Sequence, residues 1–262
     1  MNYNVLFSCI SHVGNCRSMN QDNFICDGQY LSNKDEDIVF PLIGNVSSRK
    51  KSIFGIFDGM GGEECGEIAS FIAAKRAATL VVSKDVVADI LHYCLDVNEE
   101  ICEYAKDNSV ASMGTTAAIL VFATSEIVLC NIGDSKIFRF YEGKIEQISY
   151  DHIVVFSHST KPFLSQNLGI PSDELIIEPY VARGQYNIGD IYLICSDGLT
   201  DMLVEEEIKN VLTTVAFDKM AQALLDKALA NGGRDNITII VCKIEREVGR
   251  LKRIFKTLTK EV

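Results

Sequence analysis

The sequence predicts an α+β fold in which helices cover packed β-sheets. Apolar strands follow one another through short connections, of which Glu142-Gly143 is a typical hairpin signal. Helical periodicity occurs in neighbouring pairs of segments and does not alternate with single strands. No Pro- or Ser-rich linker, internal repeat or low-complexity tract divides the 262 residues, so we expect one large domain.

The first half of the chain is expected to begin with strands and to continue with two helices. The predicted strands cover residues 4–11, 23–26, 38–46 and 51–57. Helical spacing of apolar residues starts at Glu63 and again at Asp85, the second helix extending to Asp107.

The second half is expected to contain most of the sheet. Strands are predicted over residues 114–122, 127–132, 135–141, 144–149, 175–182, 191–196 and 237–244, and helices over 204–212 and 219–230. Residues 245–262 form a basic tail with helical spacing, which we interpret as a solvated helix face in preference to a membrane anchor.

Composition excludes several classes of protein. A net charge of −11 argues against a nucleic-acid-binding protein. The nine cysteines are an odd number with no Cys-x-x-Cys pair, and several lie within apolar strands, which predicts a reducing cytosol and no zinc site. The first ten residues lack the features of a signal peptide, and no apolar run is long enough to span a membrane.

Three strand ends carry an aspartate close to glycine: Asp58, Asp197 and Asp235. Asp58 lies between a strand and a helix, so it either caps the helix or holds a cation. If the three carboxylates converge, they repel each other strongly without a cation. Hard oxygen ligands of this kind suit Mg²⁺ or Mn²⁺.

Six segments of the chain resemble motifs of the metal-dependent serine/threonine protein phosphatases, the protein phosphatase 2C-like family. They occur in the same order as in that family and at similar distances along the chain. They are residues 17–22 (RSMNQD), 57–62 (FDGMGG), 114–116 (GTT), 131–135 (NIGDS), 196–201 (SDGLTD) and 233–236 (GRDN). The resemblance implies a sandwich of two antiparallel sheets flanked by paired helices. It also implies a phosphatase domain over residues 1–244 with a two-metal site at one end.

The resemblance also implies the metal ligands. Asp58 would bridge two Mn²⁺ or Mg²⁺ ions, and the carbonyl of Gly59 would complete one of them. Asp197 and Asp235 would hold the other ion. Asp22 would act close to the metals, directly or through water. A water bridging the two ions would then attack the phosphoryl group, so no protein nucleophile is needed.

Other matching residues have supporting roles. Arg17 would grip the substrate phosphate with its planar fork of donors. Asn236 would steady the ligands around the metals, and Asp134 and Asp201 match positions that support a third, looser ion in some bacterial relatives. Arg17 also has a simpler interpretation as a surface residue in a salt bridge. The aspartates have a simpler interpretation as turn residues. Thr115, Thr116 and the histidines at positions 12, 92 and 152 are interpreted as structural.

Three departures from the family pattern concern catalysis and substrate selection. Met60 stands where some members carry a histidine that can act as general acid, and methionine cannot protonate a leaving group. Gln21 replaces an acidic residue beside the metals. Only eleven residues separate Asp151 from the segment 163–169, so the mobile flap of the family is shortened, and Gln166 stands in place of an arginine.

The expected function is an active phosphatase for phosphoserine and phosphothreonine in proteins. It would be a cytoplasmic monomer that opposes a serine/threonine kinase. A pseudophosphatase that serves as a binding module is one alternative, although such proteins typically lose the metal carboxylates that this chain retains. A hydrolase of small phosphorylated metabolites is the other, because the flap is short.

Overall fold

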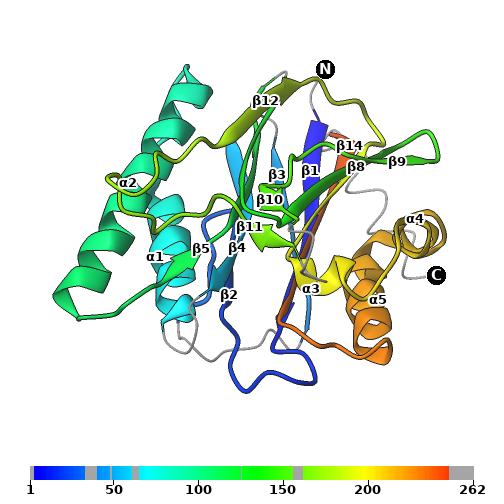
Figure 1. The fold of residues 1–262 in the computed structure, drawn as a ribbon. Coiled ribbons are helices and arrows are strands. Elements are labelled where there is room, and N and C mark those ends of the chain that lie inside the picture. The colour runs from blue at the N-terminus through cyan, green and yellow to red at the C-terminus, as the bar shows by residue number, and fades with distance from the viewer. Residues whose placement is uncertain are drawn as a thin grey trace, which may run out of the picture.

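The computed structural model describes residues 3–32, 40–47, 49–60, 65–124, 126–155 and 162–247. Two antiparallel sheets pack face to face, and Figure 1 shows helices on the outer side of each. The predicted α+β class and the two-sheet sandwich are therefore confirmed. The register of the strands in these two sheets positions the strand ends that carry the aspartates.

The first sheet joins both ends of the described chain. Its order is β3 (Leu42–Ser47), β1 (Tyr3–His12), β14 (Ile237–Arg246), β13 (Ile191–Cys195), β8 (Lys136–Tyr141) and β9 (Lys144–Gln147). The ladder between β1 and β14 runs over ten residues, from Tyr3 opposite Arg246 to His12 opposite Ile237. Residues that begin β14 are therefore fixed against the end of β1.

The second sheet carries the strand that ends in the Asp58 motif. Its order is β12 (Tyr180–Gly184), β7 (Ile127–Ile132), β6 (Ala117–Phe122), β4 (Ser52–Met60) and β2 (Asp22–Cys26), and β5 (Gly114–Thr115) pairs with the end of β4. A separate small hairpin consists of β10 (Ile153–Val154) and β11 (Phe163–Leu164).

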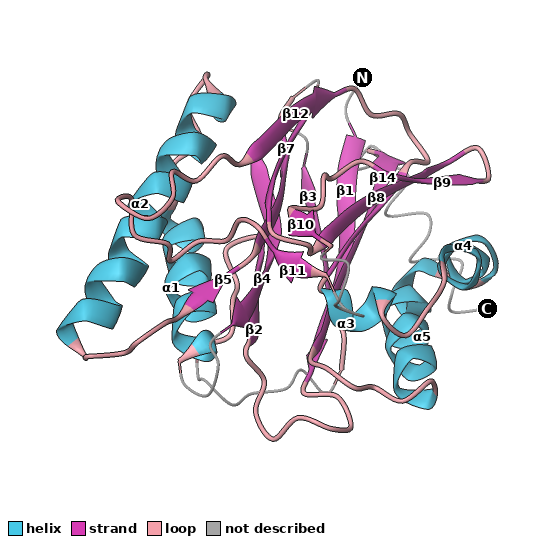
Figure 2. Ribbon diagram, viewed as in Figure 1, coloured by secondary structure: helices cyan, strands magenta, loops and turns pink. Residues whose placement is uncertain are grey.

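Helices cover the outer faces of both sheets, as Figure 2 shows in cyan. The second sheet is covered by α1 (Gly66–Thr79) and α2 (Val86–Asp107), and the first by α3 (Asp197–Thr200), α4 (Glu205–Thr214) and α5 (Phe217–Ala230). The carboxylate of Asp85 accepts a hydrogen bond from the Ala88 amide and so caps α2.

Strands buried on both faces explain the long apolar runs in the sequence. In β6, Ile119 and Val121 pack against the helices, whereas Leu120 and Phe122 pack between the sheets. The side chains of β14 divide in the same way, with Ile240 facing the opposite sheet. Burying both faces of a strand favours continuous Val, Ile and Leu over alternation with polar residues.

Several predicted boundaries are wrong. The strand expected over residues 114–122 is interrupted at Thr116, because Asp58 N of the neighbouring strand donates to Thr116 Oγ1 and so leaves the backbone ladder at this point. The strand expected over 175–182 starts only at Tyr180, because the amides of Glu174 and Leu175 bond to Pro171 O in a turn and Pro179 has no amide hydrogen. No local pattern predicts β10, β11 or the short α3.

Parts of three expected elements lie outside the described residues. Leu42 is the first residue of β3, and residues 38 and 39 of the strand expected over 38–46 lie outside the described residues. Gly61 and Gly62 also lie outside, and α1 begins at Gly66. At the other end, β14 continues to Arg246, two residues past the expected strand end, and 248–262 of the expected basic tail are not described.

All nine cysteines are free thiols, and six of them are buried. No helix among the described residues is long and apolar enough to cross a membrane.

Candidate metal centre

Four of the expected metal ligands lie at one end of the two sheets. Asp22 begins β2 directly opposite Asp58 of β4. Asp197 begins α3 immediately after β13, and Asp235 lies two residues before β14, the strand that pairs with β13. Four segments that are separated in sequence therefore deliver their carboxylates to the same place.

Asp22 connects the two sheets. Its side chain is buried, and Oδ2 accepts hydrogen bonds from Ser196 Oγ at 2.8 Å and Thr238 Oγ1 at 2.7 Å, both from the opposite sheet. Oδ1 is buried as well and has no hydrogen-bond partner among the described residues. Burial raises the pKa of Asp22 to about 6, although the two hydroxyl donors oppose the shift.

Mutual repulsion shows that the carboxylates are close enough to act on one another. Burial, and then the charges of Asp134, Asp235, Asp201 and Asp22, raise the pKa of Asp197 to about 7. The pKa of Asp58 also lies well above its ordinary value, first through burial and then through Asp22 and Asp197. A set of carboxylates that repel each other in this way favours the binding of a cation, because the positive charge would offset the repulsion.

The donor set fits Mn²⁺ or Mg²⁺, which prefer carboxylate and carbonyl oxygens. The unpartnered Oδ1 of Asp22 is one oxygen that a cation or its water would satisfy. As the side chains stand, no three His, Cys, Asp or Glu residues in the described part of the chain already form a metal site. Asp235 is instead bonded to Arg17, with 2.7 Å between Nη2 and Oδ2.

The backbone around Asp58 is held by threonines. Thr116 N and Thr115 Oγ1 both donate to Asp58 O, at 2.9 and 3.0 Å, and Asp58 N donates to Thr116 Oγ1 at 3.1 Å. These contacts agree with a structural role for both threonines. Gly59 has no room for a side chain, because a Cβ there would lie 2.2 Å from Gly66 O and 2.4 Å from Gln21 O. The close approach of three backbone segments explains why glycine follows Asp58.

Asn236 fixes the loop that carries Arg17 and Gln21. Its Oδ1 accepts the Gln21 amide at 2.9 Å, and its Nδ2 donates to Val13 O and Met19 O, both at 2.9 Å. The side chain is buried, so its hydrogen bonds have no competition from bulk water. Asn236 therefore holds the Arg17 loop against the start of β14.

Asp134 and Asp201 lie on the outer side of the same group. Asp134 is half-buried in the turn after β7, and its pKa is raised by burial and by Asp151 and Asp201. Asp201 ends α3 and is exposed, and its amide donates to Asp197 O at 2.7 Å. The buried His152 accepts the Gly133 amide at 3.3 Å and so supports the Asp134 turn.

Ser196 and Thr238 are site residues that sequence reasoning missed. Both are buried, and their hydroxyls converge on Asp22. The available signal was a hydroxyl residue at the end of an otherwise apolar strand: Ser196 directly precedes Asp197, and Thr238 is two residues after Asn236.

Comparison with known proteins gives consistent matches. The sequence model described as protein phosphatase 2C matches residues 43–234. The serine/threonine phosphatase stp of Listeria innocua is 28% identical over 258 residues, which covers 90% of this chain and 93% of that protein. The serine/threonine protein phosphatase PstP of Mycobacterium tuberculosis is 29% identical over 210 residues, 73% of this chain and 40% of that protein.

Solved structures share the fold. The crystal structure of the M. tuberculosis phosphatase PstP/Ppp gives a TM-score of 0.76 at 25% identity, covering 92% of this chain and 100% of that one. The catalytic domain of PstP in complex with 2 manganese ions gives a TM-score of 0.74 at 25% identity, covering 92% of this chain and 99% of that chain.

Proposed function

The chain belongs to the protein phosphatase 2C family, and we propose on this premise that it hydrolyses phosphoserine and phosphothreonine in proteins, with Mn²⁺ or Mg²⁺ as cofactor. The strongest support is the convergence of Asp22, Asp58 and Asp197 with raised pKa values, beside a buried carboxylate oxygen that has no hydrogen-bond partner among the described residues. A group of that kind is poorly suited to stand without a cation.

We assign the ligands by position. Asp58 would contact both ions with help from the Gly59 carbonyl, Asp197 and Asp235 would hold the second, and Asp22 would contact the centre directly or through water. Two divalent cations supply a water of lowered pKa and neutralise charge on the phosphoryl oxygens when they are bound.

Arg17 is the proposed phosphate-binding residue. Its side chain is 53% exposed, so it can turn toward a substrate, and its guanidinium already engages the carboxylate of Asp235. A planar guanidinium binds phosphate in the same bidentate manner as carboxylate. Binding of substrate would therefore transfer Arg17 from Asp235 to the phosphate and release Asp235 toward a cation.

Two further assignments follow from position. Asp134 and Asp201 are proposed to hold a third, looser ion, and Asn236 to keep the Arg17 loop in place. Met60 has no proton to give, so the leaving oxygen would take its proton from water.

The cellular setting is also a proposal. Nine free thiols suit a reducing compartment, which supports a cytoplasmic location. A phosphatase of this specificity would act in signalling, opposite a serine/threonine kinase. We propose that it acts as a monomer with one catalytic domain over residues 1–244, followed by a basic tail.

The test compares phosphopeptides with p-nitrophenyl phosphate, in Mn²⁺ and in excess chelator. We expect Mn²⁺-dependent phosphate release from phosphothreonine peptides, and none from Asp58→Asn. Turnover of the small ester alone would favour the metabolite-hydrolase alternative. A protein that binds phosphopeptides but turns over neither substrate with Mn²⁺ would be a pseudophosphatase.

A further inference from the structure

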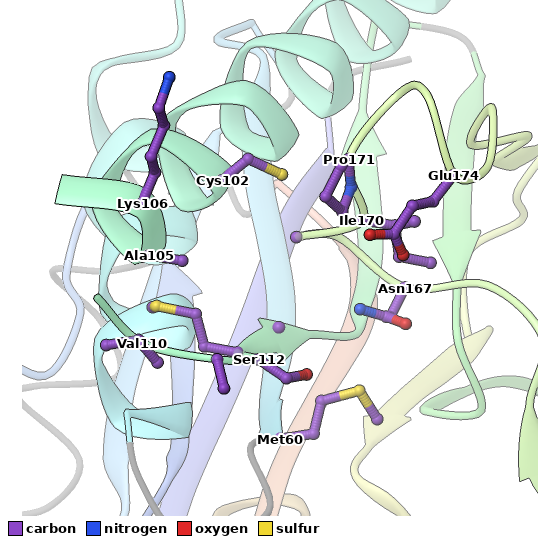
Figure 3. A pocket seen from close by; sticks show the side chains of 14 residues that line it. Met60, Cys102, Ala105, Lys106, Val110, Ser112, Asn167, Ile170, Pro171 and Glu174 are labelled. Carbon is purple, nitrogen blue, oxygen red and sulfur yellow. The ribbon is translucent and has the colours of Figure 1, made fainter. Parts of the chain in front are cut away.

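A cavity of about 510 Å³ opens between the C-terminal half of α2 and the loop that follows β11 (Figure 3). Its walls include Met60 at the end of β4, Val110 and Met113 after α2, and Ile170 and Glu174 in the loop. A volume of this order accommodates one or two amino-acid side chains.

The cavity and the proposed reaction centre share strand β4. Met60 is two residues beyond Asp58 on β4, so the two side chains lie on the same face of the strand, about 7 Å apart along it. Met60 pairs with Gly114, which also lines the cavity. A peptide whose phosphorylated residue is at Asp58 therefore has its neighbouring residues within reach of this space.

The loop wall is fixed before any ligand arrives. Asn98 of α2 is buried, its Nδ2 donates to Ile170 O at 2.9 Å, and its Oδ1 accepts the amides of Gly169 and Ile170 at 2.8 and 3.1 Å. Thr115 and Leu168 exchange two backbone hydrogen bonds of 3.0 and 2.9 Å. A wall held in this way loses little conformational freedom when a side chain binds.

The cavity combines apolar side chains with polar groups and a carboxylate. Figure 3 shows the carboxylate of Glu174 turned into the cavity, whereas the amine of Lys106 points away from it. Within the described residues neither side chain forms an ion pair. After burial, the charges of Glu174, Asp173 and Glu99 raise the pKa of the Cys102 thiol that lines this space.

We propose that this cavity is a specificity pocket for a lysine or arginine side chain located close to the phosphorylated residue of the protein substrate. The inference rests on the proposed phosphatase function. The aliphatic stem would lie against Met60 and Ile170, and the charged end would reach Glu174. An acidic side chain would meet repulsion at the same place, so the pocket selects by charge.

The test uses a set of phosphothreonine peptides. Each peptide carries Lys, Ala or Glu at one position, and every position on either side of the phosphothreonine is tested in turn. We expect one or more positions at which Lys gives a higher kcat/KM than Glu. Glu174→Gln should reduce this Lys-to-Glu ratio by about threefold to tenfold, and higher salt should reduce it in the parent. Glu178→Gln is the matched control, because Glu178 is an exposed acid of the same loop that does not line the cavity.

The ratio is measured within each variant, so a smaller fraction of folded enzyme cancels. A parent without Lys preference at any position would overturn the pocket assignment, and so would a Glu174→Gln ratio equal to that of the parent or a matching loss in Glu178→Gln. In these cases phosphopeptides are still hydrolysed and the proposed function stands. Hydrolysis of p-nitrophenyl phosphate without any hydrolysis of phosphopeptides would overturn the proposed function and this inference together.

Discussion

Asp22 and Asp58 occupy opposite positions of the β2–β4 ladder, so two aspartates of like charge share one register position of a sheet. Ser196 and Thr238 of the other sheet donate to Asp22 from across the sandwich. The packing of the two sheets therefore forces the carboxylates together, and the cost of that arrangement should be measurable.

The stability of the metal-free protein should fall as pH rises. The folded-state pKa values of Asp22, about 6, and Asp197, about 7, lie above the value of about 3.9 for an unfolded aspartate. The folded protein thus retains protons that the unfolded chain releases, and the free energy of unfolding decreases between about pH 4 and pH 7. Urea unfolding in chelator at several pH values measures this.

Mn²⁺ should reverse the loss at neutral pH. A cation that binds only the folded state at about 100 times its Kd adds about 2.7 kcal/mol to the free energy of unfolding. A chelated protein that is more stable at pH 7 than at pH 5, or that is indifferent to Mn²⁺, would argue against a cation-binding carboxylate group.

Asp58→Asn and Asp134→Asn should respond differently to metal. The first removes charge from the proposed bridging ligand, and turnover should fall at least ~10³-fold at every Mn²⁺ concentration. The second affects only the looser ion, so activity should recover at least partly when Mn²⁺ is raised. Recovery of Asp58→Asn would show that another residue bridges the ions, and an unchanged metal dependence of Asp134→Asn would make that residue structural.

Arg17→Ala should raise KM for phosphopeptides, because the bidentate phosphate contact is lost. Since Arg17 engages Asp235, its removal should not weaken Mn²⁺ binding and should leave Asp235 free for the ion. Arg17→Lys should restore affinity only in part, because an ammonium lacks the planar fork. Kinetics equal to those of the parent, with weaker Mn²⁺ binding, would make the Asp235 contact the main role of Arg17.

Asn236→Ala should destabilise the protein by about 3 kcal/mol, because its buried side chain makes three hydrogen bonds of roughly 1 kcal/mol each. Asn15→Ala is the matched control, since Asn15 also bonds two carbonyls across the same interface but is exposed, and it should cost about 1 kcal/mol or less. Denaturant unfolding in chelator compares the two. Equal effects would mean that Asn236 does not hold the Arg17 loop.

Local patterns indicated three of the carboxylates, whereas Asp22 and the shared metal site came from the resemblance to the protein phosphatase 2C-like family. Each of Asp58, Asp197 and Asp235 stands beside a strand and close to a glycine. For each aspartate, the strand and the glycine lie within a few residues of it in the sequence. The hydroxyl of Thr238 could not be assigned in the same way, since its partner Asp22 is 216 positions away and only the sheet packing brings them together. Their roles as metal ligands stay predictions until the variants are measured.

The errors in the fold have similar causes. Leu175 and Ile176 look like strand residues, but the turn at Pro171 and the bond from Glu178 N to Gln166 Oε1 place them in a loop. Thr116 has strand-forming neighbours, yet Asp58 N donates to its side-chain hydroxyl, which interrupts the backbone ladder. In both places a contact between distant segments overrides a local preference.

The pairing of β1 with β14 has a consequence for synthesis of the protein. Tyr3 is opposite Arg246, so β1 emerges from the ribosome long before its second neighbour, β14, exists. Contacts of such sequence separation form slowly. Asp235 and Asn236 emerge just ahead of the same late strand, so a nascent chain has neither its central ladder nor its full set of carboxylates. Catalytic competence should therefore arise only after translation has passed β14, which keeps a partly made phosphatase silent.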